Sequence, residues 1–135
     1  MFGKKVSKPK NRIDSLIGAE ARIDGNIGFN GGLRVDGEVN GNVIATPGKP
    51  STLVLSELGR VNGEISVTHL VVNGVIDGPV RAAEYLELQS KARVTGNVHY
   101  KTLEIQLGAI VEGRLIHLDD AVSDKVVAFK LNNAD

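Results

Sequence analysis

The residues best suited to hold a metal ion lie in the sequence LRVDGEVNGNV at residues 33–43. Asp36, Glu38 and Asn40, followed by a glycine, have the spacing of the first half of a calcium-binding loop, in which alternate oxygen ligands converge. The twelfth position of such a loop requires a bidentate acid, and here it is Pro47. In a strand, moreover, the three polar side chains point outward along a line. We therefore expect no calcium site.

Histidines and paired acids are the other residues with the chemistry of a metal or catalytic site. His69, His99 and His117 stand at different distances from the repeated glycines described below, so they are expected on different parts of the fold, unlike a ligand triad. Asp119 and Asp120 are adjacent, and adjacent residues of a strand face opposite sides. The sequence contains no cysteine, no phosphate-binding loop and no nucleophile motif. It predicts neither catalysis nor a cofactor.

Six glycines organise most of the chain, because each is followed two residues later by Val, Ile or Leu. By subtraction, the spacings between them are 16, 22, 15, 18 and 17 residues. The longest interval contains the sequence ATPGKPS at 45–51, whose prolines and glycine predict a surface loop inserted into a regular array. Such a repeat indicates a fold of stacked, similar units. The glycines are Gly25, Gly41, Gly63, Gly78, Gly96 and Gly113.

Side chains of one type recur at fixed, even distances from these glycines. Aliphatic residues stand two before, two after and eight before each glycine, and only Gly or Ala stands four before. Residues an even number apart share one face of a strand, so these side chains are expected to point into the core, with the small residues at corners. The residues eight before the glycines are predicted to form one core ladder: Ile17, Leu33, Leu55, Leu70, Leu88 and Ile105.

This pattern predicts an all-β, single-domain parallel β-helix, or solenoid, of about six coils that lie about 4.8 Å apart. A β-hairpin is the local alternative, but only two residues lie between Gly37 and Asn40, too few for a strand between two turns. Polar residues dominate the odd positions. Among them, Arg22, Glu38 and Arg60 are expected to form an outer ladder of alternating charge that helps register and solubility.

Charge divides the chain into three parts. The formal net charge is zero, so no nucleic-acid partner is expected. Residues 1–14 carry five basic residues and one acidic residue, a net charge of +4 (5 − 1). We expect a basic flexible tail at 1–14, the β-helix at 15–117 and a C-terminal capping or tail segment at 118–135. No apolar run approaches the roughly 20 residues of a membrane span, and no secretory signal is evident, which predicts a cytoplasmic protein.

The two ends of a coil stack expose unpaired backbone groups and a cross-section of the aliphatic core. The sequence before the first coil contains no amphipathic helix that could cover it. We therefore expect the rod to grow into a filament by end-to-end association. The alternative is that the apolar C-terminal residues close the sixth coil and leave a monomer or dimer. The residues assigned to the polymerisation interface are Ile17, Ile23, Val126, Val127, Phe129 and Leu131.

The first residues of the chain combine an apolar tip with lysines. Met1 and Phe2 precede Lys4 and Lys5, and this combination suits the anionic cytoplasmic face of a membrane. Each lysine near such a surface contributes about 1 kcal/mol, which is marginal for one molecule but sufficient for a filament that displays many tails. A tail that only increases solubility is the alternative.

The coils RVDGEVNGNV, RVNGEISV, LVVNGVIDGPV and RVTGNV, between a short basic tail and a short apolar tail, resemble the bactofilin family. The resemblance covers roughly residues 15–117. It implies a right-handed β-helix and bacterial cytoskeletal filaments that assemble without nucleotide. It also implies a membrane-associated scaffold for cell shape that positions peptidoglycan-modifying enzymes. Residues that match the membrane-targeting tip of many members are Met1, Phe2, Lys4 and Lys5, and those that match the apolar assembly segment are Val127 and Phe129.

Two other functional classes remain open. A monomeric solenoid that binds carbohydrate, or that serves as a protein adaptor, is the main alternative. A carbohydrate-binding module should carry an exposed aromatic platform, and Tyr85 and Tyr100 stand at different positions in their coils. An enzyme is the third class, and a pocket rich in perturbed acids would favour it. We expect a non-enzymatic, self-polymerising scaffold at the inner face of the cytoplasmic membrane.

Overall fold

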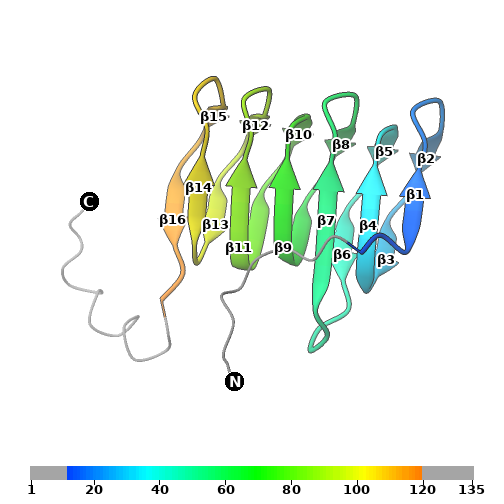
Figure 1. The fold of residues 1–135 in the computed structure, drawn as a ribbon, viewed down its shortest axis with the longest axis horizontal. Helices are drawn as coiled ribbons and strands as arrows, with labels where there is room; N and C mark the ends of the chain where they lie inside the picture. The colour runs from blue at the N-terminus through cyan, green and yellow to red at the C-terminus, as the bar shows by residue number, and fades with distance from the viewer. Residues whose placement is uncertain (1–11, 120–135) are drawn as a thin grey trace.

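The structure is a computed structural model that describes residues 12–119. Within this range the chain forms sixteen β-strands and no helix, and the strands stack side by side from β1 at one end to β16 at the other (Figure 1). All pairings between these strands are parallel. The predicted parallel β-helix is confirmed, and the hairpin alternative is wrong.

Each coil has three faces, and each face is a ladder of parallel strands. The first face contains β1 (Ser15–Ile17), β4 (Gly31–Val35), β7 (Ser51–Leu55), the second halves of β9 (Ile65–Val72) and β11 (Val80–Leu88), and β14 (Leu103–Ile105). The second contains β2 (Arg22–Asp24), β5 (Glu38–Asn40), β8 (Arg60–Asn62), β10 (Val75–Asp77), β12 (Arg93–Thr95) and β15 (Ile110–Glu112). The third contains β3 (Ile27–Phe29), β6 (Val43–Ala45), the first halves of β9 and β11, β13 (Val98–Tyr100) and β16 (Leu115–His117).

Aliphatic ladders fill the interior of the coils. On the second face, the residues two before the repeated glycines stack in register, as the sequence predicts. Side chains of the middle coils are almost completely buried, and each contributes about 1.5–3 kcal/mol before conformational entropy is subtracted. This ladder consists of Ile23, Val39, Val61, Ile76, Val94 and Val111.

The predicted ladder of residues eight before the glycines is wrong in two coils. Val35, not Leu33, pairs with Ile17 and Leu55, and Val72 replaces Leu70 in the same way. Leu33 and Leu70 belong to the neighbouring inward ladder instead, where they are 3% and 0% exposed. The shift is two residues, and an even shift leaves a side chain on the same face of the strand. The core was therefore predicted correctly, but its stacking partners were not.

The length of one corner causes this shift. In four coils a β-turn joins the first face to the second, with an N–H···O=C bond of 2.8–3.2 Å across it. In the second and fourth coils the corner is two residues shorter, and the loops before β5 and β10 rise less than those before β2, β8 and β12 (Figure 1). The four β-turns are Gly18–Ala21, Ser56–Gly59, Gln89–Ala92 and Gln106–Ala109.

The outer surface of the second face carries the predicted ladder of alternating charge, but the ion pairs form between different columns. Arg22, Glu38 and Arg60 are in register. However, Arg22 forms an ion pair with Asp24 at 3.0 Å, and Arg60 forms one with Asp77 at 3.0 Å. Each of these Arg side chains therefore reaches a carboxylate in the column two residues further on, and not the Glu38 carboxylate in its own column. These exposed pairs contribute about 0–1 kcal/mol each.

A column of asparagine side chains stands directly after the repeated glycines. Each side-chain oxygen accepts a hydrogen bond from the backbone N–H at the same position in the next coil. Pro79 occupies this position in the fourth coil and has no N–H, and the third coil carries Glu64 in place of Asn. The donor–acceptor pairs are Asn42 N to Asn26 Oδ1 at 2.8 Å, Glu64 N to Asn42 Oδ1 at 2.9 Å and Arg114 N to Asn97 Oδ1 at 3.0 Å.

Candidate functional site

The aliphatic ladders end on partly exposed side chains at both ends of the described stack. In the last coil Ile105 is 49% exposed and Leu115 is 44% exposed. Their neighbours one coil inward, Leu88 and Val98, are 1% and 0% exposed. In the first coil, the inward apolar residues of β1, β2 and β3 are half-buried, and Ser15, which pairs with Leu33, is exposed. Each end therefore presents an apolar cross-section of the core.

Backbone edges accompany these apolar surfaces. Within residues 12–119, β2 and β15 are the outermost strands of the six-stranded sheet, and β1 and β16 end the main path of the other sheet. An edge strand presents N–H and C=O groups that can pair with another strand. The repeated glycines also show that the first coil is an open edge. A Cβ at Gly41 would collide with the carbonyl oxygen of Gly25 in the coil before it, whereas a Cβ at Gly25 would meet nothing within 4 Å. Both ends combine apolar surface with β-edges.

The structure places only part of the predicted polymerisation interface. Ile17 on β1 and Ile23 on β2 are both half-buried, inward-facing residues of the first coil, at the N-terminal end of the stack. The other predicted site residues lie outside the described part of the chain: Met1, Phe2, Lys4, Lys5, Val126, Val127, Phe129 and Leu131.

The candidate calcium ligands are engaged by neighbouring side chains. Asp36 accepts a hydrogen bond from Arg34 at 2.8 Å. Asn40 donates to Asp24 Oδ1 at 2.9 Å and accepts from Asn62 at 2.6 Å. The three side chains follow the outer surface of the second coil, as expected for a strand. Among residues 12–119, no group of three or more His, Asp or Glu side chains is placed to hold a metal ion.

The sequence predicts that the histidines lie on different parts of the coil, but the structure separates only His69 from the other two, because His99 and His117 lie on neighbouring paired strands of the third face. His69 is on β9, His99 is on β13 and His117 is on β16. His117 contacts Asp119 through Nδ1 at 2.9 Å, and its ring packs edge-on against Tyr100 with centroids 5.5 Å apart.

Hydrogen bonds shift the pKa values of two carboxyl groups, and burial shifts that of one tyrosine. Asn40 and then Arg22 donate to Asp24 and hold the pKa of its carboxyl below the usual value of 3.8. The backbone N–H of Gly32 and the guanidinium of Arg12 lower the pKa of Asp14 in the same way. Burial, together with the hydrogen bond that the Tyr85 hydroxyl donates to Glu104, raises the pKa of Tyr85.

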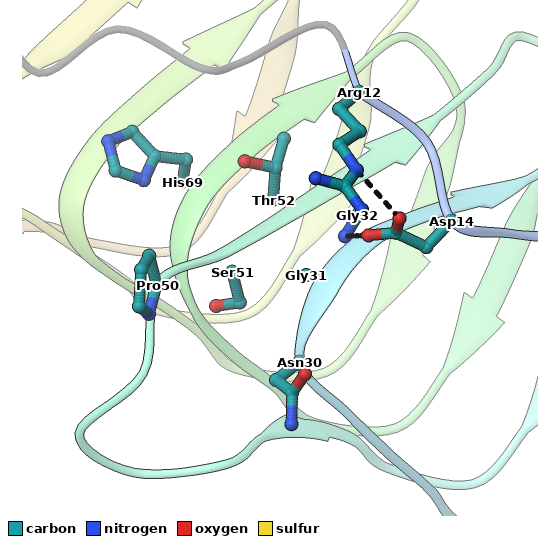
Figure 2. Close-up of a pocket in the computed structure, with 9 residues that line it drawn as sticks. All are labelled: Arg12, Asp14, Asn30, Gly31, Gly32, Pro50, Ser51, Thr52 and His69. Atoms are coloured by element: carbon teal, nitrogen blue, oxygen red, sulfur yellow. Dashed lines mark hydrogen bonds and ion pairs between the residues drawn. The ribbon is translucent and has the colours of Figure 1, made fainter.

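A pocket on the first face was not predicted from the sequence. It has a volume of about 500 Å³ and lies beside the inserted loop at residues 45–51, and we call it the side pocket (Figure 2). The pair Gly31–Gly32 is the one feature of the sequence that could have indicated this pocket, because two successive glycines leave a gap in a row of side chains. The residues around it are Arg12, Asp14, Asn30, Gly31, Gly32, Pro50, Ser51, Thr52 and His69.

The glycines of the side pocket allow the start of the chain to cross β4. A Cβ at Gly31 would collide with the carboxylate of Asp14, and a Cβ at Gly32 would collide with the carbonyl oxygen of Arg12. Asp14 Oδ2 accepts from the Gly32 N–H at 2.8 Å, and the Asp14 N–H donates to the Gly32 carbonyl at 2.8 Å. Arg12 is thereby held at the rim of the pocket.

Within residues 12–119 there is no helix that is long and apolar enough to cross a membrane.

Comparisons with known proteins identify the family to which this chain is similar. Residues 15–116 match the family described as "Bactofilin: Polymer-forming cytoskeletal". Bactofilin BacP of Myxococcus xanthus is 28% identical over 112 residues, which are 83% of this chain and 45% of that protein. Bactofilin BacO of the same organism is 26% identical over 102 residues, 76% of this chain and 78% of that protein.

The chain spans less than half of the length of BacP. No solved structure matches it. The family match covers the whole range of strands from β1 to β15 and most of β16, and the chain belongs to the bactofilin family of polymer-forming cytoskeletal proteins.

Proposed function

We propose that this chain polymerises end to end, without nucleotide, into filaments that form a non-enzymatic scaffold on the inner face of the cytoplasmic membrane. In this role the filaments position cell-wall enzymes and so contribute to cell shape. The observation that carries the proposal is the exposure of the core ladders at the ends of the described stack: Ile105 and Leu115 in the last coil are 49% and 44% exposed, and Ile17 and Ile23 in the first coil are half-buried. Association of two ends removes this apolar surface from water and pairs the β-edges at the same time.

Substitutions at the ends test the polymerisation directly. Ile105→Arg places a charge on the terminal rung of a ladder, and Ile17→Arg does the same in the first coil. Each has a matched control nearby, because Leu107 is 95% exposed at a corner and Leu16 is 60% exposed on the outer side of β1. We expect the two Ile variants to sediment as short species that keep their β circular dichroism spectrum. Leu107→Arg and Leu16→Arg should sediment like the wild type.

The outcomes separate polymerisation from folding. Loss of the β spectrum in Ile105→Arg would mean that this residue is needed for the coil itself, and Leu115→Arg then provides the second test at the same end. Filaments of unchanged length in both variants would contradict end-to-end association. Assembly that stops after apyrase treatment would contradict nucleotide independence.

Membrane association rests on the composition of the N-terminal tail. The apolar tip Met1–Phe2 can insert into the interface while Lys4 and Lys5 attract anionic lipids. Co-sedimentation with vesicles of phosphatidylethanolamine and phosphatidylglycerol tests this. Phe2→Ser combined with Lys4→Gln and Lys5→Gln should leave the polymer in the supernatant, whereas Lys8→Gln with Lys10→Gln should not. Equal pelleting of all variants on vesicles would end the membrane proposal.

Positioning of enzymes requires that filaments capture partners. Cross-linking in the native cell, followed by purification of the filaments, should recover peptidoglycan-modifying enzymes. Recovery should fall in the Ile105→Arg strain if the polymer, and not the single molecule, is the scaffold. The same cells should lose their normal shape, and a normal shape would contradict the cellular role.

A further inference from the structure

We propose that His117 is a pH-dependent clip at the C-terminal end of the stack, and that its protonated form favours association of this end with another molecule. The proposal rests on the end-to-end polymerisation inferred above and adds a condition that controls it. His117 lies on β16, the last strand of the described stack (Figure 1). Its contacts with the preceding coil and with the segment after β16 carry the argument.

The side chain of His117 forms part of the end surface of the stack. It stands two residues after Leu115, so both side chains lie on the inward side of β16, and Leu115 is 44% exposed. The strand partner of His117 is Tyr100, which in turn pairs with the fully buried Ala82. The imidazole ring packs on the ring of Tyr100 at an interplanar angle of 63°, with centroids 5.5 Å apart. A ring that can carry charge therefore ends one row of the core.

Both ring nitrogens of His117 face oxygen atoms that can only accept hydrogen bonds. Nε2 lies 3.0 Å from the backbone carbonyl oxygen of Lys101, and Nδ1 lies 2.9 Å from Asp119 Oδ1. A neutral imidazole carries one N–H and one lone pair, so one nitrogen would present its lone pair to an acceptor. The doubly protonated ring donates at both positions, and its contact with the carboxylate is charge-assisted. The conformation of the last coil therefore fits the imidazolium form.

The surroundings of the ring allow its proton to come and go. The titratable groups that face it are Tyr100 on β13 and Asp119 just after β16, and Lys101 faces it with its carbonyl oxygen. His99 precedes Tyr100, so its side chain lies on the other side of β13. The His117 side chain is 53% exposed and exchanges its proton with solvent. An imidazole in water has a pKa of about 6.5, so this exchange takes place in the physiological pH range.

The clip fixes the end of β16 to the coil before it. Next to the ring, the Leu118 N–H donates to the Tyr100 carbonyl oxygen at 2.6 Å. When the ring is neutral and keeps its N–H on Nε2, the lone pair on Nδ1 faces the Asp119 carboxylate and repels it, so this contact opens. The end of β16 is then less ordered, and association must order it against conformational entropy. Assembly should therefore be stronger below the titration range of imidazole and weaker above it.

The test is the critical concentration for assembly of the full chain, measured by pelleting a dilution series at about pH 6 and at about pH 8. We expect it to be about threefold higher at the higher pH, as for the loss of one exposed ion pair. His117→Gln is neutral at both pH values and should abolish this dependence. His99→Gln is the matched control, because it removes an imidazole from the outer side of the neighbouring strand, and it should keep the wild-type ratio.

Asp119→Asn separates the proton from the clip. The new amide can donate to the lone pair on Nδ1, while the N–H on Nε2 still donates to the Lys101 carbonyl oxygen. The neutral ring then satisfies both contacts, so assembly of this variant should be as strong at the higher pH as at the lower. A substitution that only removed a structural contact would instead assemble weakly at both pH values, as we expect for His117→Gln.

Nitrogen–carbon NMR correlation spectra observe the clip independently of polymerisation. A cross-peak between His117 Nδ1 and the Asp119 carboxyl carbon should be present at about pH 6 and absent at about pH 8, and in Asp119→Asn it should be present at both. A wild-type cross-peak at both pH values, an equal critical concentration at both, or an unchanged pH dependence in His117→Gln would overturn the proposal. Absence of polymer at every pH would contradict the proposed function, and the cross-peak would then decide the clip by itself.

Discussion

Gly63 lies so close to the carbonyl oxygen of Gly41 in the preceding coil that a methyl group on its Cα would overlap that oxygen. The same contact repeats at every coil boundary from the first coil to the sixth. The backbone at these glycines is extended with positive φ, between 144° and 159°. The repeated glycine is therefore required by the distance between coils as well as by the bend of the chain. The stacked pairs are Gly41 on Gly25, Gly63 on Gly41, Gly78 on Gly63, Gly96 on Gly78 and Gly113 on Gly96.

Substitution of a stacked glycine should destabilise the coil. Gly63→Ala combines overlap with a backbone oxygen and an unfavourable φ of 158°, and we expect a loss of about 3 kcal/mol in the free energy of unfolding. Gly18→Ala is the matched control, because a Cβ there meets nothing within 4 Å and its φ is not positive. Thermal unfolding at one protein concentration measures both variants. Similar transition midpoints in the two variants would show that the coils can separate to admit a methyl group.

The asparagine column provides a second test of stacking. Asn42→Ala removes the acceptor of the Glu64 N–H bond of 2.9 Å, and we expect it to lower the free energy of unfolding by about 1 kcal/mol. Glu64→Asn should have no stabilising effect, because Pro79 above it has no N–H to donate. Denaturant unfolding measures the two effects.

A backbone N–H at position 79 should make Glu64→Asn stabilising. Pro79→Ala creates an N–H, and Glu64→Asn supplies its acceptor, so the double variant should be more stable than the sum of the single changes by about 1 kcal/mol. A double-mutant cycle measures this coupling. Additive effects would contradict the role assigned to the asparagine column.

A hydroxyl pair formed by the buried Ser51 and the half-buried Thr68 connects the inserted loop to the rest of the fold. Thr68 Oγ1 accepts from the N–H of Ser51 at 2.6 Å and donates to its carbonyl oxygen at 2.5 Å, and the two hydroxyl oxygens are 2.9 Å apart. Thr68→Val keeps the size but removes the acceptor of the Ser51 N–H and the donor to its carbonyl oxygen, which should lower the free energy of unfolding by about 2 kcal/mol. Thr102→Val, at an exposed position, is the control. Equal stability in chemical denaturation would contradict this account.

The carboxyl of Asp24 should titrate at unusually low pH. Its pKa is lowered mainly by the hydrogen bond from Asn40 and next by Arg22. A pKa that is lower in the folded state stabilises the fold above the unfolded value, and this contribution is lost as the pH falls through the folded pKa. The stabilisation is therefore present at neutral pH and disappears below about pH 4.

Solid-state carbon NMR of the assembled protein measures this titration through the carboxyl shift of Asp24. Asn40→Ala should move the midpoint up toward the usual value of 3.8, because it removes the larger cause. Arg22→Gln should move it in the same direction by a smaller amount. A midpoint that is unchanged in Asn40→Ala would show that the hydrogen bond does not persist.

Much of the coil could be predicted from the sequence because the repeated glycines fix the residues around them. Ile23, Val39 and Val61 are each two residues before a glycine, and the structure stacks them in register. The stacking partners of residues further from the glycines depend on the length of the corner between the first two faces, and this length varies by two residues. Leu33 therefore belongs to a different ladder from the one predicted, although it is still inside the core.

The side pocket could not be predicted because its parts are distant in the sequence. Arg12, Gly32, Thr52 and His69 come from four different coils, and only the stacking brings them around one hollow. The same is true of the ion pair between Arg60 and Asp77, which lie in neighbouring coils. Pair contacts between coils depend on the reach and direction of each side chain, and one repeat of the sequence does not contain that information.

The sequence by itself determined the repeat, the inward face and the β-solenoid, because the alternation of aliphatic and polar side chains allows only one face of an extended chain to be buried. The tertiary structure decided the corner lengths, the side-chain partners and the side pocket. It also showed that the core ladders end on exposed rungs, such as Ile105 at 49%, at the ends of the described stack. These features depend on distances between coils, which are set only when the coils pack on one another.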